Sequence, residues 1–416
     1  MYFKEFNINQ WQQFENININ FENRLTVLTG ANGSGKTTIL KLLSKHQGWK
    51  NNIFAVPQKN KETGIVSFIK RLFGKENISD DLLIGSISYS DGSNANLTIS
   101  KTNSLQYDIE IQDQRIINCF YIPSHRSIYK YRSIINIPVQ KKTKKMAFNE
   151  ISETTKKRYV GGSGQDGYIG QDPENNSFLM KSTLISWAIQ GYGNQAMSSD
   201  QELIDNYEGF KKILKIVLPK TLGFENFEIR NMEIIFICNN GNDQFLLETA
   251  SGGIGAIIDI AWQIYMFSTE DKKLFTVIID EIENHLHPIM QRSILPNLLE
   301  AFPNVKFIIS THSPLVVGSV KDSTTYALKY NDNKKIQSHQ LNFQKQTKNA
   351  IEILDEVLGV SFTMPIWVEN ELEKIISKFS SQEINENSFI ELRKELSSIG
   401  LEKLMPFTIT KLLEGQ

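Results

Sequence analysis

The first third of the chain has the hydrophobic pattern of strands, with one early helix. Residues 14–21 alternate apolar and polar side chains and residues 25–29 form a β-branched run, so both segments predict strands. A helix pattern follows a Gly-rich turn. Between residues 84 and 112, three short alternating stretches separated by turn-forming residues predict an antiparallel meander, which we interpret as a β subdomain inserted after this helix.

Strands and helices alternate in the second half. Strand-like segments return from residue 225, and an apolar helix is expected at 253–267. Apolar strands predicted at 274–279 and 305–309 flank a helix near 288–301. Alternating β and α units favour an α/β fold with a largely parallel sheet.

The stretch between these halves has a different character. It is basic from residue 130 to 158, with nine Lys or Arg and two acidic residues, then Gly-rich at 161–176 and helix-like at 177–218, so we interpret it as an insertion. The basic run is a candidate for DNA contact, with solvated surface as the alternative. Three tyrosines flank it and are candidates for base stacking: Tyr129, Tyr131 and Tyr159.

The last 70 residues predict amphipathic helices. One helical face carries Val368, Leu372, Ile375, Ile376 and Phe379, and a second carries Phe389, Leu392, Leu396 and Ile399. This extension is expected either to dock a partner or to cap the edge of the sheet.

Composition excludes several classes of protein. With 45 Lys and Arg against 46 Asp and Glu, the net charge of −1 indicates no general affinity for nucleic acid or membranes. Cys119 and Cys238 have no CxxC spacing, which excludes a disulfide framework or a cysteine-based zinc site. No apolar run approaches the length of a membrane span, and the first ten residues lack the apolar core of a signal peptide. We therefore expect a cytoplasmic protein with no membrane contact.

A Gly-rich turn links the strand at 25–29 to the following helix. Its sequence, GANGSGKTT, satisfies the phosphate-loop pattern G-x-x-x-x-G-K-[ST]. Glycines let successive backbone N–H groups point at phosphates, and the helix N-terminus adds favourable electrostatics. We expect Lys36 to reach the β- and γ-phosphates and the Thr37 hydroxyl to ligate Mg²⁺. The predicted nucleotide-binding residues are Gly30, Asn32, Gly33, Ser34, Gly35, Lys36, Thr37 and Thr38.

Ionisable side chains that could act in catalysis follow the two apolar strands of the second half. Asp280 and Glu281 end the strand at 274–279, where a carboxylate can hold Mg²⁺ and its neighbour can orient or deprotonate an attacking water. His312 ends the second strand, at the same sheet edge, and can donate to a γ-phosphate. Ser251, Gly252 and Gly253 form a further anion-binding turn before the apolar helix. Because the phosphate loop already serves one nucleotide, this turn suggests a second subunit.

These motifs, in this order, resemble the ABC-type ATPase heads of the SMC, RecF and OLD group. The matching segments are GANGSGKTT at 30–38, SGG at 251–253, VIIDE at 277–281 and STHSP at 310–314. The segment DEIENHLHP is similar to that of OLD-type and related antiviral ATPases, and transporter ATPases differ there. The resemblance implies an ABC/SMC-type P-loop head with an antiparallel β subdomain, a helical insertion and a C-terminal helical extension.

The resemblance also implies how the site works. In this family two heads sandwich two ATP molecules, each bound by the phosphate loop of one head and the signature of the other. ATP, Mg²⁺ and a homodimer are therefore expected, with Ser251, Gly252 and Gly253 acting in trans, Glu281 as the catalytic glutamate and His312 as the switch histidine. The implied parts are an ATPase lobe at 1–125, a basic and helical insertion at 126–224, a second ATPase lobe at 225–345 and a helical extension at 346–416.

Some positions depart from the family pattern. Ala250 stands where Leu commonly precedes the signature, and Gly255 stands where Gln or Glu is frequent. The best match to the Q-loop is the segment 121–126, with Gln58 as a weaker choice. Residues 283–287 match the D-loop; the alternative of a metal site formed by Glu283, His285 and His287 is weaker, because no further His or Cys lies nearby in the sequence.

The chain contains no recognisable effector. It lacks heptads for a long coiled coil, an Asp after Asp355 for a Toprim nuclease, and an HNH-like histidine cluster. Its length, opening and helical tail look similar to the standalone ATPases of Septu PtuA-type and retron-associated antiphage systems, whose partner is a small HNH nuclease. The alternatives are a RecF/SMC-like DNA-binding repair ATPase and a transport ATPase; the LHP segment and the large insertions disfavour the latter.

Overall fold

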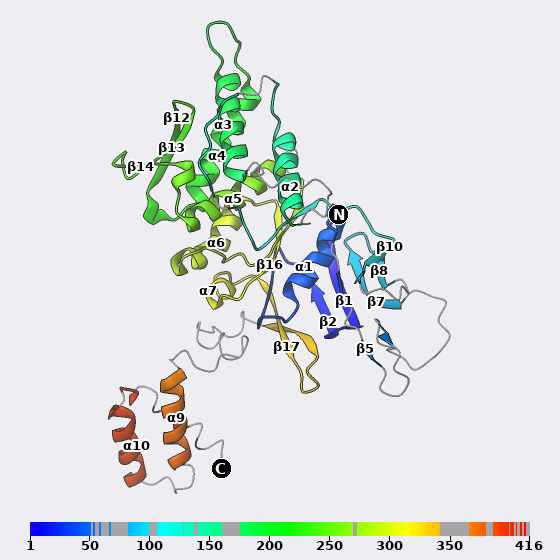
Figure 1. Ribbon diagram of the computed structural model, residues 1–416, viewed down its shortest axis with the longest axis vertical. Helices are drawn as coiled ribbons and strands as arrows, with labels where there is room; N and C mark the ends of the chain where they lie inside the picture. The colour runs from blue at the N-terminus through cyan, green and yellow to red at the C-terminus, as the bar shows by residue number, and fades with distance from the viewer. Residues whose placement is uncertain are drawn as a thin grey trace. The chain divides into compact units, whose positions relative to one another are not determined.

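The computed structural model describes residues 1–50, 53–54, 58–59, 66–67, 82–99, 106–127, 129–136, 140–159, 175–268, 273–341, 366–379, 386–398, 400–402, 405, 408–409 and 412. The chain divides into two compact units, Met1–Ile353 and Leu354–Gln416 (Figure 1). Each has a hydrophobic core of its own. In the described part of the chain, no helix has the length and apolar character that a bilayer crossing requires. The predicted Gly-rich stretch lies outside the described residues from 161 to 174.

An eleven-stranded sheet forms the centre of the first unit. In sheet order its strands are β10 (Ile109–Gln112), β8 (Asn94–Ile99), β7 (Leu82–Tyr89), β1 (Phe3–Trp11), β2 (Phe14–Asn20), β18 (Ile336–Leu341), β17 (Thr324–Tyr330), β3 (Leu25–Gly30), β16 (Val305–Ser310), β15 (Phe275–Ile279) and β11 (Cys119–Ile122). Strands β3, β15 and β16 are buried at every position, as expected of strands covered on both faces. The apolar strands predicted from the sequence are therefore confirmed.

Only one half of this sheet is parallel. Strands β11, β15, β16, β3 and β17 are parallel to one another, whereas β2, β1, β7, β8 and β10 form antiparallel pairs. Between the two groups, β18 pairs antiparallel with β17 and parallel with β2. The prediction of a largely parallel sheet thus holds only for the first group. The meander is antiparallel because short turns join its strands, whereas parallel strands need long crossover connections. The predicted meander is confirmed, and because β7 pairs with β1 it continues the main sheet. Two short pairs lie apart from it: β4 (Ile53–Phe54) with β9 (Gln106–Tyr107), and β5 (Gln58–Lys59) with β6 (Val66–Ser67).

The strands predicted from residue 225 onward form a separate antiparallel sheet. They are β12 (Phe224–Arg230), β13 (Glu233–Cys238) and β14 (Asp243–Leu246). The turn between β12 and β13 consists of two residues, Asn231 and Met232, and both have positive φ, as two-residue hairpin turns require. The four-residue connection from β13 to β14 begins with Asn239 and Asn240, which also have positive φ. These strands therefore do not contribute to the parallel sheet.

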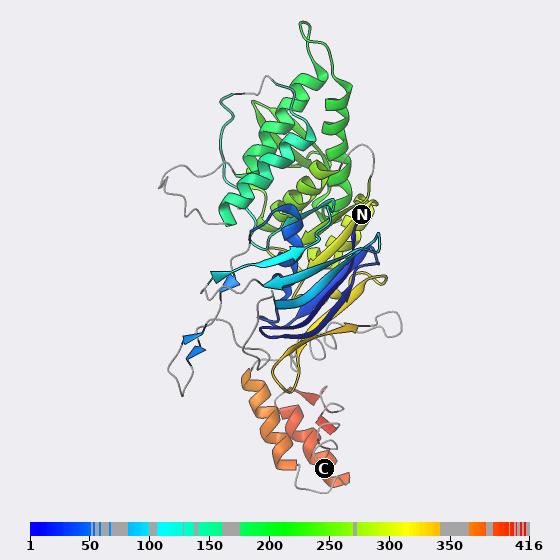
Figure 2. The same ribbon diagram turned by 90° about the vertical axis from the view of Figure 1, so that its right-hand side faces the viewer.

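The helices of the first unit fall into two groups. Helix α1 (Lys36–Ser44) and the 3-10 turn η1 (Lys45–Gln47) pack on the main sheet. The second group lies together at one end of the unit, away from β1 and β7, in both Figure 1 and Figure 2. It comprises α2 (Lys144–Tyr159), α3 (Asn176–Tyr192), α4 (Gln201–Val217) and α5 (Gly252–Phe267), with α6 (Pro288–Ala301) against α4. Shorter elements are η2 (Lys220–Leu222), η3 (Leu247–Thr249) and α7 (Pro314–Val317).

Two helices, α9 (Ile366–Phe379) and α10 (Glu386–Ser398), form the described core of the second unit. Leu372, Phe379, Leu392 and Leu396 are buried in it, which confirms the amphipathic pattern at these positions. Phe389 departs from the pattern, because 41% of its surface is exposed.

Candidate functional site

The phosphate loop runs from the end of β3 to the start of α1, and two of its glycines are required by geometry. Gly30 has φ +141°, and a Cβ there would lie 2.4 Å from the Leu328 carbonyl oxygen. Gly35 has φ +85°, and a Cβ there would lie 2.2 Å from the Phe14 ring. Glycine is therefore required at both positions. Its conformational freedom lets the loop backbone curl around an anion.

Lys36 begins α1 and is buried inside the loop. Its Nζ donates to the Gly30 and Ala31 carbonyl oxygens at 2.9 and 3.0 Å. Burial lowers the pKa of Lys36 to about 8, against the opposing pull of Asp280 and the glutamates that follow it. A cation thus lies inside the loop, bound to two loop carbonyl oxygens and close to the carboxylates that follow β15. Of the other predicted loop residues, Ser34 is buried, Thr38 is half-buried, and Asn32 and Gly33 are exposed.

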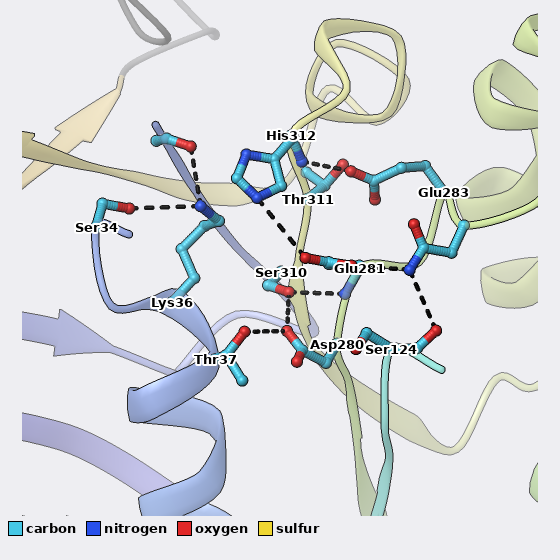
Figure 3. Close-up of polar contacts among 12 residues, drawn as sticks. Ser34, Lys36, Thr37, Ser124, Asp280, Glu281, Glu283, Ser310, Thr311 and His312 are labelled. Carbon is cyan, nitrogen blue, oxygen red and sulfur yellow. Dashed lines mark hydrogen bonds and ion pairs between the residues drawn. The ribbon is translucent and has the colours of Figure 1, made fainter. Parts of the chain in front are cut away.

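Asp280 connects three elements at the carboxyl edge of the parallel strands. Its Oδ1 accepts hydrogen bonds from the Thr37 hydroxyl at 3.1 Å and the Ser310 hydroxyl at 2.5 Å. Its Oδ2 accepts one from the Tyr121 hydroxyl at 3.4 Å. The pairing of β15 with β16, and of β16 with β3, places these side chains side by side (Figure 3). A carboxylate and a hydroxyl oxygen in contact are the hard donors that Mg²⁺ prefers, so Thr37 and Asp280 fit the predicted metal site.

Glu281 and His312 face each other beside Asp280 (Figure 3). Their Oε1 and Nε2 atoms are 3.9 Å apart, and the Glu281 amide donates to the Ser310 hydroxyl oxygen at 2.8 Å. The His312 amide donates to the Glu283 carboxylate. Burial, followed by the nearby Lys36 charge, lowers the pKa of His312 despite the two glutamates. A neutral histidine and a carboxylate therefore lie together next to the phosphate loop.

The signature turn lies at the N-terminus of α5. Ser251 is exposed, and its side chain makes no capping hydrogen bond to the helix. A Cβ at Gly253 would lie 2.9 Å from the Met290 sulfur and 3.0 Å from the His285 carbonyl oxygen. The turn therefore packs against the segment that follows β15. Within the described residues, Ser251 has no hydrogen bond to the phosphate loop of its own chain.

The sequence motifs did not predict a role for several residues that contact the site. Ser310 lies within the STHSP segment and Asn284 within DEIENHLHP, yet neither was assigned a role. The Q-loop candidate 121–126 does reach the site, through Tyr121 and through contacts of Ser124 and Arg126 with the residues after Asp280. The side chain of Gln58, the weaker candidate, lies outside the described part of the structure. Only proximity in the fold reveals these contacts.

Two of the three residues considered as a metal site make other contacts. The His287 side chain caps the first turn of α6, and Glu283 accepts from the His312 amide. Among the residues that the structure describes, no group of three or more His, Cys, Asp or Glu side chains is arranged to hold a metal ion.

Much of the basic run is paired within the protein. Lys141 lies 2.8 Å from Asp200 and 2.5 Å from Glu202, and Lys142 lies 2.5 Å from Glu150. Two other cations of the run also have contacts within the chain. The Lys144 amine lies over the Tyr265 ring, and the Lys156 amine donates to the Gln47 carbonyl oxygen. Of the flanking tyrosines, Tyr129 has a buried hydroxyl, and the Tyr131 hydroxyl donates to Glu233. The side chain of Tyr159 is outside the described residues.

Known proteins are similar to this chain over much of its length. The AAA ATPase domain family matches residues 1–317. A retron Vc95 probable ATPase from Vibrio cholerae is 23% identical over 86% of this chain and 79% of its own length. A Septu protein PtuA from Bacillus thuringiensis is 22% identical over 92% of this chain and 91% of its own. Among solved structures, the SMC head domain from Thermotoga maritima covers 82% of this chain and 100% of its own, with 14% identity and a TM-score of 0.41. The family match contains every candidate site residue.

Proposed function

Because this chain belongs to the AAA ATPase domain family, we propose that it is the ATPase subunit of a bacterial antiphage complex, whose nucleotide state regulates a separately encoded effector nuclease. The chain is an ATPase. The names of its relatives, a retron ATPase and a Septu protein, support the defence role over the alternative of a repair ATPase. The effector expected with it is a small nuclease of HNH type, and the complex is expected in the cytoplasm.

The ATPase part of this proposal rests on one observation: five side chains from three segments of the chain lie together. Lys36, Thr37, Asp280, Glu281 and His312 converge at one edge of the sheet, through the contacts described above. In the proposed mechanism, Lys36 binds the β- and γ-phosphates, and Glu281 orients and deprotonates the attacking water. His312 donates to the γ-phosphate. Thr37 and Asp280 hold Mg²⁺, which when bound neutralises charge on the phosphates.

A second copy of the chain completes the proposed site. The first-turn amides of α5 and the exposed Ser251 form an anion-binding helix end with no acidic residue in its first turn. We infer that Ser251, Gly252 and Gly253 bind the nucleotide held by the partner head, giving a homodimer with two shared sites. The C-terminal unit, with its separate core, is the candidate docking surface for the effector. At least four of the nine cations of the basic run contact groups within the same chain, so the proposal does not rest on DNA contact by that run.

The test separates nucleotide binding from turnover. Lys36→Ala should lose ATP binding, because the buried cation for the phosphates is gone. Glu281→Gln should keep ATP binding near the level of the original chain but lose turnover by about 100-fold or more, and should accumulate as an ATP-bound dimer. Fluorescent-ATP titration, phosphate release and mass in solution measure the three properties.

Glu300→Gln, an exposed glutamate on α6, is the matched control and should behave like the original chain. Normal phosphate release from Glu281→Gln would contradict the role given to this residue. Co-purification from the native operon tests the effector: a complex that contains no nuclease would contradict the proposed regulation.

A further inference from the structure

The backbone at the proposed general base has an unusual conformation. Glu281 has φ +45° and His285 has φ +70°, both in the left-handed region that non-glycine residues rarely adopt. Such a conformation is strained in a non-glycine residue and persists only where surrounding contacts hold it. The segment from 281 to 285 is therefore held in place by its neighbours.

Arg126 supplies one of these contacts from the carboxyl side of β11. Its Nη1 donates to the Asn284 carbonyl oxygen at 3.0 Å, and its Nη2 donates to the Glu281 carbonyl oxygen at 3.2 Å. The residue is 9% exposed. One buried guanidinium therefore fixes both ends of the Glu281 to Asn284 turn, a contact that its planar fork makes possible.

Asn284 supplies the second contact, on the side chain of Glu281. Its Nδ2 donates to Glu281 Oε2 at 2.8 Å and to the Ser124 carbonyl oxygen at 3.1 Å. The amide thus links the carboxylate to the segment after β11. With Oε2 held, the other oxygen, Oε1, faces His312.

We propose that Asn284 and Arg126 are positioning residues for ATP hydrolysis, which hold the Glu281 carboxylate in the orientation needed to activate water. This inference rests on the proposed role of Glu281. Asn284 fixes the carboxylate, and Arg126 fixes the backbone that carries it. Arg126 lies in the segment after β11, where the helical insertion begins, and Asn284 is tied to the same segment through the Ser124 carbonyl oxygen. On this proposal, a shift of that segment would change the orientation of Glu281 without changing the phosphate loop.

The experiment uses an isostere to separate orientation from packing. Asn284→Asp keeps the size of the side chain but replaces the donor with a carboxylate that repels Glu281; Asn284→Ala removes both size and donor. We expect kcat to fall about 10-fold to 100-fold in both variants, with KM and ATP affinity unchanged within about twofold. Arg126→Lys, which cannot form the fork, should show the same split between kcat and KM.

Asn297→Ala is the matched control, because Asn297 is a half-buried amide that donates to the Val217 carbonyl oxygen, away from the site. It should leave kcat unchanged. ATP affinity and thermal unfolding, measured for every variant, report whether the site is folded. A normal kcat in Asn284→Asp, or equal losses of kcat and ATP affinity in Asn284→Asp and Arg126→Lys, would overturn the proposal.

A double-mutant cycle with Glu281→Gln completes the test. If Asn284 acts through Glu281, adding Asn284→Ala to Glu281→Gln should lower the residual rate less than twofold, whereas independent effects would multiply. If Glu281→Gln alone turns over ATP normally, the catalytic role proposed for Glu281 fails, and the positioning role fails with it. If Glu281→Gln is inactive and the Asn284 variants are normal, only the positioning role fails.

Discussion

The candidate site residues contact neighbours that are distant in the sequence. Thr37 and Asp280 are 243 positions apart and share a hydrogen bond. The sequence predicted Lys36, Asp280, Glu281 and His312 as site residues because each has a recognisable position after a strand. It did not predict the partners of Glu281, because a hydrogen bond between side chains depends on distances that a motif does not contain.

His46 gives a pH prediction at this scale. Its ring lies between the Leu43 carbonyl oxygen at 3.0 Å and the Tyr89 hydroxyl at 2.9 Å, and burial lowers its pKa to about 4, with the Leu43 carbonyl opposing. As pH falls, the unfolded chain takes up this proton first, near pH 6.5, so folded-state stability is lost between pH 6.5 and 4. From pH 7 to 5 the loss should be about 2 kcal/mol.

We expect the unfolding midpoint in urea to fall less between pH 7 and 5 for His46→Gln than for the original chain. His339→Gln, at an exposed position on β18, is the control and should keep the full pH dependence. Equal pH dependence in His46→Gln and the original chain would show that another group is responsible.

Elements meet through a few buried contacts. The turn before the signature is one case: Lys181 of α3 has a fully buried side chain and pairs with Glu248 of η3 at 2.9 Å and with Glu233 of β13. These contacts join a helix, a separate sheet and the turn that precedes Ser251. The hydrophobic pattern predicted these elements individually, but not their association, because Lys181 and Glu233 read as surface residues in a sequence.

Removal of Lys181 should therefore destabilise the protein strongly. Lys181→Met leaves Glu248, whose side chain is 1% exposed, without its counter-charge, and the free energy of unfolding should fall by about 3–5 kcal/mol. Lys141→Met, which breaks two exposed ion pairs, should lower the free energy of unfolding far less. Urea unfolding of both variants tests the contrast, and a similar small loss in both would contradict the importance of the buried cluster.

The whole molecule is proposed to act as a pair of heads. The phosphate loop and the signature turn lie on separate parts of one chain, with Ser251 exposed. If each site is shared, a subunit with an intact phosphate loop and a subunit with an intact signature can together form one complete site. Complementation between variants tests this arrangement directly.

Lys36→Ala and Ser251→Arg should each be inactive alone, and mixing them should restore turnover. With random exchange, half of the dimers are mixed and each has one intact site, so about a quarter of the original rate is expected if the sites are independent. Lys36→Ala mixed with Glu281→Gln is the control: both residues act in the same half-site, so no site is repaired. Absence of rescue in the first mixture, with exchange verified by mass, would contradict the shared site.

The sequence by itself determined the phosphate loop, the buried parallel strands and the positions of Asp280, Glu281 and His312, because backbone conformation and strand burial follow local patterns of glycine and apolar residues. The tertiary structure alone decided that the strands from residue 225 join a separate sheet, that the meander continues the main sheet, and that at least four cations of the basic run contact other parts of the chain. It also decided that Arg126 and Asn284 hold Glu281. These features depend on long-range packing and charge pairing, which arise only when segments distant in the chain come together.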